Sequence, residues 1–138
     1  MCLTLSVELA MKKGEAERIV SLYSSVTLDF HFDGTTSFFG HGNPRLSISE
    51  KGEGCACSIL ADGADWHAQI WELRLDLLPD LALALLFISE LASDGYIFEA
   101  VWAGDRPKKN VEATLNEMLE IVQRNSIGTR TRYTVRAA

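Results

Sequence analysis

The sequence predicts an α+β fold, a two-layer α/β sandwich in which three helices pack on one face of a mixed, mostly antiparallel sheet of about six to seven strands. Three observations predict this fold. Several segments alternate apolar and polar residues at period two, as strands with one buried face do. Short connections in the first half suit antiparallel neighbours, and helical segments between strands in the second half suit parallel crossovers. Because many of the alternating polar residues are charged, we expect the face without helices to be ionic.

The first half of the chain predicts one strand, one helix and then a series of strands. The helix is expected over 14–24, where Ala16 and Ile19 belong to a set of apolar residues at helical spacing. The turn signal Asp33-Gly34 ends the second strand. The segments that we expect to be strands cover about 2–10, 26–33, 37–39, 45–49, 55–60 and 66–77.

The second half begins with a helix over about 78–93 that is apolar almost all round. Pro79 suits its first turn, and Asp80 suits the positive end of the helix dipole. The strand that follows, 96–102, is apolar on both faces except at Glu99, so we expect it to be central in the sheet.

A last helix is expected to begin at 104–107 and to lead into a final strand over 128–136. Its apolar residues form a one-sided stripe, which consists of Val111, Leu115, Met118, Leu119 and Val122.

Length and charge limit the classes of partner. We interpret the 138 residues as one domain, 1–138. The net charge of −6 and the pI near 5.0 argue against nucleic acid and anionic membranes as partners. The longest apolar run, 81–88, is far shorter than the roughly 20 residues that span a bilayer. The three cysteines lack zinc-finger spacing and the N-terminus lacks a signal peptide pattern, so we expect a cytoplasmic protein.

Imidazole, carboxylate and thiol groups that could bind a metal recur in the predicted strands. Side chains two residues apart on one strand diverge, so a metal would need further ligands from another strand. Ile59 shares the face of the two cysteines, which favours a core position for both thiols. We therefore predict no metal and no cofactor. The groups weighed for this role are Asp29, His31, Asp33, His41, Cys55, Cys57 and His67.

Glu99 is the one charge in the strand that we expect to be most buried. A carboxylate removed from water often has a functional role. The alternative is a buried ion pair with an arginine on a neighbouring strand, for which Arg74, Arg130 and Arg132 are the candidates. We favour the ion pair, because an unpaired buried charge would cost several kcal/mol.

The arginines of the last strand allow two interpretations. Arg130, Arg132 and Arg136 share one face and could bind an acidic ligand or partner. They could equally protect an edge strand from pairing with another chain. The sequence contains no nucleophile elbow, no phosphate-binding loop and no dinucleotide fingerprint, so no catalytic residue is predicted.

Two hypotheses about function follow. The first is a non-catalytic interaction domain that uses the polar sheet face to bind another protein or a second copy of itself. A small acidic domain suits the neutralisation of a basic partner, as in toxin-immunity proteins. We expect a homodimer, because a sheet face that includes Ile70 needs covering.

The second hypothesis is a small-molecule binder or enzyme with its site on the open sheet face. A concave pocket where His31, Glu99 and an arginine converge would favour it, and a flat face would favour the first hypothesis. The candidate binding residues are Asp29, His31, Asp33, Arg74, Glu99, Arg130 and Arg132.

Overall fold

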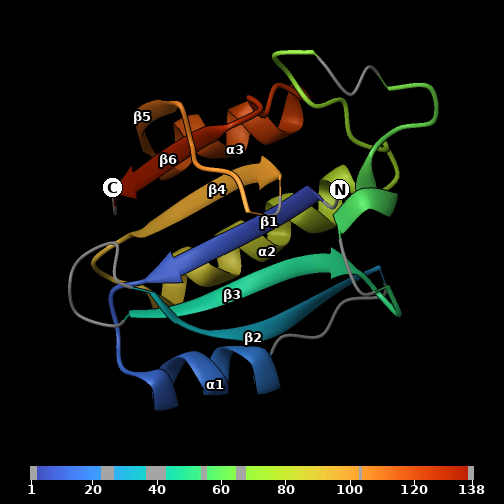
Figure 1. Cartoon of the computed structure of the whole chain (residues 1–138). Coiled ribbons are helices and arrows are strands. Elements are labelled where there is room, and N and C mark those ends of the chain that lie inside the picture. The colour runs from blue at the N-terminus through green and yellow to red at the C-terminus, as the bar shows by residue number, and fades with distance from the viewer. Residues whose placement is uncertain are drawn as a thin grey trace.

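The computed structural model describes residues 3–22, 27–36, 43–53, 56–64, 68–102 and 104–136. Six strands form a single sheet in the order β2-β3-β1-β4-β6-β5 (Figure 1). The elements in chain order are β1 (Leu3–Leu9), α1 (Lys13–Leu22), β2 (Leu28–Thr36), β3 (Asn43–Glu50), the 3₁₀ helix η1 (Ala56–Ile59), α2 (Leu78–Leu91), β4 (Tyr96–Trp102), β5 (Lys109–Thr114), α3 (Leu115–Gln123) and β6 (Thr131–Arg136).

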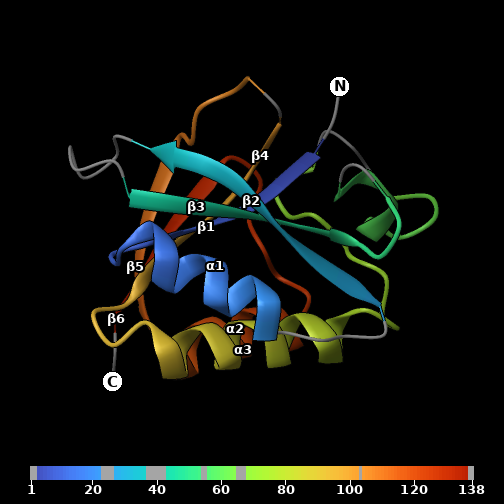
Figure 2. The same ribbon diagram turned by 90° about the horizontal axis from the view of Figure 1, so that it is seen from below.

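The sheet is mixed and mostly antiparallel. Only β5 and β6 pair in parallel, through the crossover helix α3, and the other four pairings are antiparallel. Figure 2 shows α1, α2 and α3 on the same side of the sheet, so none of these three helices covers the other side. The predicted fold class, three helices over one face of such a sheet, is confirmed.

The core lies between the sheet and the helices. On the sheet, the inward residues alternate with outward polar ones, and Leu5, Val7 and Phe98 are completely buried. On α2, Leu81 and Leu85 are buried and lie one turn apart, so that they share the face toward the sheet. Each such side chain stabilises the fold by about 1.5–3 kcal/mol through its removal from water.

The prediction that the strand over 96–102 is central is also confirmed. Tyr96–Trp102 lies between β1 and β6, and every residue in it is buried. The expected return strand over 37–39 lies outside the described residues.

Two predicted strands are wrong. Ala56–Ile59 forms a short 3₁₀ helix in place of a strand over 55–60. In the segment predicted as a strand over 66–77, the part that the structure describes makes only isolated bridges. The backbone there bonds to a side chain, because Asn125 accepts from the Leu73 N–H at 2.8 Å and donates to the Leu73 carbonyl at 2.9 Å. These bonds satisfy the backbone of Leu73, which is buried, while its neighbours Trp71 and Arg74 bond to the backbone of Ile127 and Ile59.

The last helix begins later than predicted. Lys109–Thr114 forms the edge strand β5, and the helix starts only at Leu115. A capping box fixes this start: the Thr114 side chain accepts from the Glu117 N–H, and the Glu117 carboxylate accepts from the Thr114 N–H.

Candidate functional site

A row of polar side chains crosses the helix-free face of the sheet. Each of the six strands contributes one residue, and each residue is the register partner of the next one. The row runs through His31, Ser47, Ser6, Glu99, Arg132 and Asn110. The side of the sheet without helices thus carries the expected polar and charged residues, but its centre is not open, because Ser6 on β1 and Glu99 on β4 are both buried.

Glu99 occupies the centre of this row and is paired with two arginines. Its carboxylate lies 2.9 Å from the Arg132 Nε and 3.7 Å from the Arg45 Nη2. Arg45 also donates to the Ser6 hydroxyl at 2.8 Å. The Glu99 side chain is only 4% exposed, whereas the two arginine side chains are 23% and 25% exposed. The structure thus contains the buried ion pair that we favoured, with Arg132 as one partner.

Glu8 is a second buried carboxyl on the same face, two residues along β1 from Ser6, the register partner of Glu99. Its register partner on β3 is Arg45. Burial raises the pKa of Glu8, and the negative charge of Glu99 adds to this rise. A hydrogen bond with the Asn43 side chain and the charge of Arg45 act in the opposite direction. Sequence reasoning missed Glu8 and Arg45, although both occupy polar positions in alternating segments.

The predicted residues on β2 lie far from this centre. His31 is exposed, and its Nε2 lies 3.1 Å from the Ser49 hydroxyl. Asp29 accepts a hydrogen bond from the Gly52 N–H at 3.3 Å. The side chain of Asp33 lies outside the described part of the structure. Three strand spacings separate His31 from Glu99, or about 14 Å, so the two do not converge.

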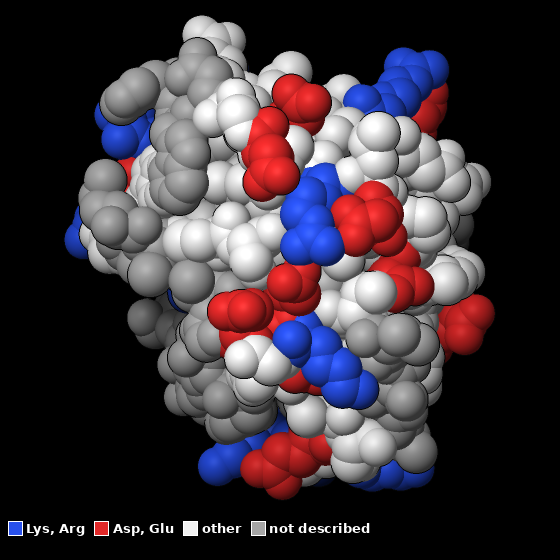
Figure 3. All heavy atoms as spheres, turned by 90° about the vertical axis from the view of Figure 1, so that its right-hand side faces the viewer, with Lys and Arg blue, Asp and Glu red and all other residues white. Residues whose placement is uncertain are grey.

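Arg74 and Arg130 each pair with an acidic neighbour. Arg74 lies in the connection before α2 and binds both Glu50 and Asp76. Its hydrogen bonds to Asp76 lower the pKa of that carboxyl. Arg130 precedes β6, and its Nε lies 2.8 Å from the Asp105 carboxylate. On the side of the molecule shown in Figure 3, acidic and basic side chains are interspersed and form no continuous patch of one sign.

Among the residues that the structure describes, no three His, Cys, Asp or Glu side chains come together as a metal site would require. His41, Cys55 and His67 lie outside that part of the chain. Cys57 is half-buried in η1, where its Sγ accepts a hydrogen bond from the Leu3 N–H at 3.2 Å.

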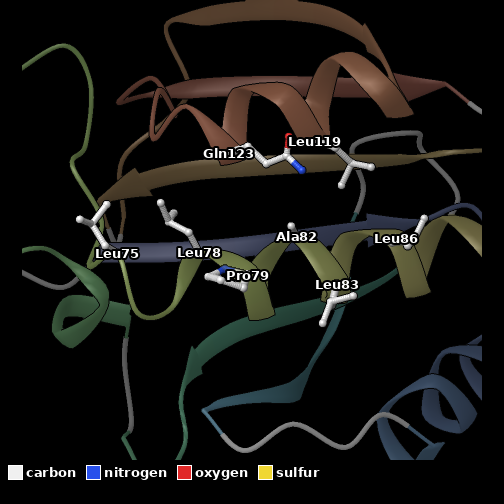
Figure 4. Close-up of a pocket in the computed structure, with 8 residues that line it drawn as sticks. All are labelled: Leu75, Leu78, Pro79, Ala82, Leu83, Leu86, Leu119 and Gln123. Atoms are coloured by element: carbon white, nitrogen blue, oxygen red, sulfur yellow. The ribbon is translucent and has the colours of Figure 1, made fainter.

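A second candidate site lies on the opposite side of the molecule, over the helices. Figure 4 shows an apolar groove between α2 and α3. Its volume is about 550 Å³. Three leucines make the surface around it apolar: Leu75 is 76% exposed, Leu83 is 58% exposed and Leu86 is 36% exposed. The residues that line this α2–α3 groove are Leu75, Leu78, Pro79, Ala82, Leu83, Leu86, Leu119 and Gln123.

The groove forms because α3 turns one set of side chains toward the core and another set toward α2. Met118 and Val122 of α3 are buried in the core, whereas Leu119 and Gln123 face α2. The helices run antiparallel, so Gln123 lies near Pro79 at one end of the groove (Figure 4). Sequence reasoning did not single out this site, although the helix over 78–93, apolar almost all round, was its signal.

The residues that line the groove are uncharged, but the two helices that form it contain four acidic residues and no Lys, Arg or His. Most of these carboxylates already have a role. Asp80 accepts a hydrogen bond from Thr27, and Glu120 pairs with Arg124 just after α3. The four acidic residues are Asp80, Glu90, Glu117 and Glu120.

Hydrogen bonds with Thr114 at the start of α3 lower the pKa of Glu117, so this carboxylate belongs to the helix cap. Glu90 is exposed, and within the described ranges it makes no ion pair.

Comparisons of the chain with protein-family models, with curated proteins and with solved structures find no match. In the described residues, no helix combines the length and apolar character that crossing a bilayer requires.

Proposed function

We propose that the protein is a non-catalytic interaction domain that binds an amphipathic helix of another protein in the α2–α3 groove. The observation that carries the proposal is the exposure of Leu75, Leu83 and Leu86 around one groove. Contiguous apolar surface on a water-soluble domain marks a binding site more often than a solvated surface. A groove between two helices suits a helical ligand, whose apolar residues at i, i+3, i+4 and i+7 fill it.

The sheet face offers less to a ligand. Its central carboxylate, Glu99, is already bound by Arg45 and Arg132, so its charges are satisfied within the chain. His31 does not reach this cluster. The small-molecule alternative required a pocket formed by His31, Glu99 and an arginine, and the strand order separates these residues. We therefore place the interaction on the helix layer.

Charge favours a different protein over a second copy as the occupant. A two-fold dimer through this groove would bring identical surfaces together, and each would present acidic side chains and no basic ones from α2 and α3. Like charges in one interface oppose association. The expected homodimer stays a prediction, which the molecular mass in solution would test. A cytoplasmic setting is part of the proposal, supported by the odd count of three cysteines.

The first experiment uses a fluorescent synthetic peptide that forms an amphipathic helix, with leucines on one face and lysines beside them. Fluorescence anisotropy measures its affinity for the wild type and for the double variant Leu83→Ser/Leu86→Ser. Each leucine buried by the peptide contributes about 1.5–3 kcal/mol, so the double variant is expected to bind at least about tenfold more weakly.

Leu91→Ser is the matched control, because Leu91 is an exposed leucine of the same helix that lines a different hollow, with Met11 and Ile19. Circular dichroism confirms that all variants fold. The absence of peptide binding to the wild type would contradict the proposal. An equal loss in the control and the double variant would contradict it too.

A further inference from the structure

We propose that the α2–α3 groove selects its helix by charge, and that Glu90 is the residue that recognises a Lys or Arg on the partner, one turn beyond the residue that contacts Leu86. This inference rests on the proposed function and adds a specificity-determining residue to it. The kind of partner is thereby defined as an amphipathic helix with basic residues beside its apolar stripe.

Helix geometry places Glu90 in line with the apolar surface of α2. Leu83, Leu86 and Glu90 are spaced i, i+3 and i+7, so they share one face. All three side chains are exposed. At a rise of about 1.5 Å per residue, Glu90 lies about 6 Å beyond Leu86 along the axis, which is close to one turn. A helix lying over the two leucines therefore passes Glu90 one turn later.

The other carboxylates of α2 and α3 are less suited to this contact, because each is engaged within the chain by Thr27, Arg124 or Thr114. Arg18 is a basic side chain near the end of α2. It lines the separate hollow beside Leu91, on the side of α1, and in the described ranges it makes no ion pair with Glu90. The Glu90 carboxylate is thus left to a partner.

An exposed charge pair at the rim of an interface has a modest and measurable effect. Pairs of this kind change affinity by about two- to fivefold, and salt screens them. Their larger contribution is to selectivity, since a like charge at the same place repels the wrong partner.

The test compares two labelled peptides with the same leucines, one with lysines and one with glutamates beside the apolar stripe. Fluorescence anisotropy gives the affinity of each peptide for the wild type, for Glu90→Lys and for Glu53→Lys. Glu53 is an exposed residue after β3, outside α2 and α3, so its variant changes the net charge of the protein equally. The wild type is expected to prefer the lysine peptide. Glu90→Lys should weaken binding of that peptide by about two- to fivefold and strengthen binding of the glutamate peptide.

Two results support the inference: a clearly smaller change in Glu53→Lys than in Glu90→Lys, and loss of the preference at high salt. Equal changes in the two variants would show that only net charge matters and would overturn it. Equal affinity of the wild type for both peptides, with binding still sensitive to Leu83→Ser/Leu86→Ser, would overturn the charge selection and leave the proposed function standing. Binding of neither peptide would contradict both.

Discussion

Two acidic residues on neighbouring central strands, Glu8 and Glu99, are both buried but have different surroundings. Glu99 lies between two guanidinium groups, so its charge is paired within the chain. For Glu8, the loss of hydration outweighs the favourable contacts with Asn43 and Arg45, as the raised pKa shows. The raised pKa of Glu8 therefore predicts that ionisation of this carboxyl lowers the stability of the fold.

The raised pKa of Glu8 predicts a pH dependence of stability with a definite sign. The folded protein holds this proton more tightly than the unfolded chain, whose glutamate titrates near 4.5. The contribution of Glu8 to the free energy of unfolding is therefore highest below about pH 4.5, and it falls as the pH rises through the folded pKa. Glu8→Gln removes this loss, so the variant should become increasingly stable relative to the wild type as the pH rises through that window.

Urea unfolding at several pH values measures this difference. Glu53→Gln, in an exposed loop, serves as the control and should show no such trend. A difference between Glu8→Gln and the wild type that does not vary with pH would contradict the assignment.

At the scale of elements, the sequence predicted correctly those helix and strand positions that depend on neighbouring residues in the chain. The start of α2 at Leu78 followed from Pro79 and Asp80, and the position of β4 followed from its apolar residues on both faces. The segment before α2 misled the prediction because its backbone bonds to Asn125, which is remote in sequence. A period-two pattern of apolar and polar residues cannot predict a hydrogen bond to a residue so far away in the sequence.

The start of α3 was predictable in part. Thr114 and Glu117 form a capping box that the sequence displays, whereas the stripe from Val111 onward fits both a helix and a strand. Similarly, Arg45 could not be assigned to Glu99 without knowing that β1 lies between β3 and β4. The alternation of apolar and polar residues predicts which side chains share a face of a strand, and the order of the strands decides which of these side chains meet.

In the turn between α2 and β4, the addition of one methyl group at Gly95 is expected to lower the stability of the fold strongly. Gly95 has φ +88°, and a Cβ there would lie 2.3 Å from the Val135 carbonyl oxygen of β6. Gly52 has φ +84° but open space around it. Gly52→Ala should therefore cost only the backbone strain, about 1–2 kcal/mol, and Gly95→Ala about 1–3 kcal/mol more, because β6 must move.

Thermal or urea unfolding of the two glycine variants measures the difference directly. Because both positions have nearly the same φ, their difference isolates the contact with β6. Equal destabilisation of the two variants would contradict the close approach of Gly95 to this strand.

At the scale of the whole molecule, the sheet face and the helix face differ in whether their side chains find partners within the chain. The central carboxylate of the sheet face, Glu99, is paired with Arg45 and Arg132. The helix face leaves Leu83 and Leu86 exposed at an apolar groove. The sequence analysis placed the candidate site on the sheet face because the alternating pattern contains many charged residues. The pattern does not show whether those charges are paired within the chain. We therefore propose the groove, and not the sheet face, as the surface that binds a partner.

One measurement tests this account most directly: amide chemical-shift mapping of the ¹⁵N-labelled protein during titration with the lysine-flanked amphipathic peptide. The account predicts that the largest shifts fall on residues 75–90 and 119–123, around the α2–α3 groove. Shifts centred on Ser6, Arg45 and Glu99 of the sheet face, or an unchanged spectrum, would contradict it.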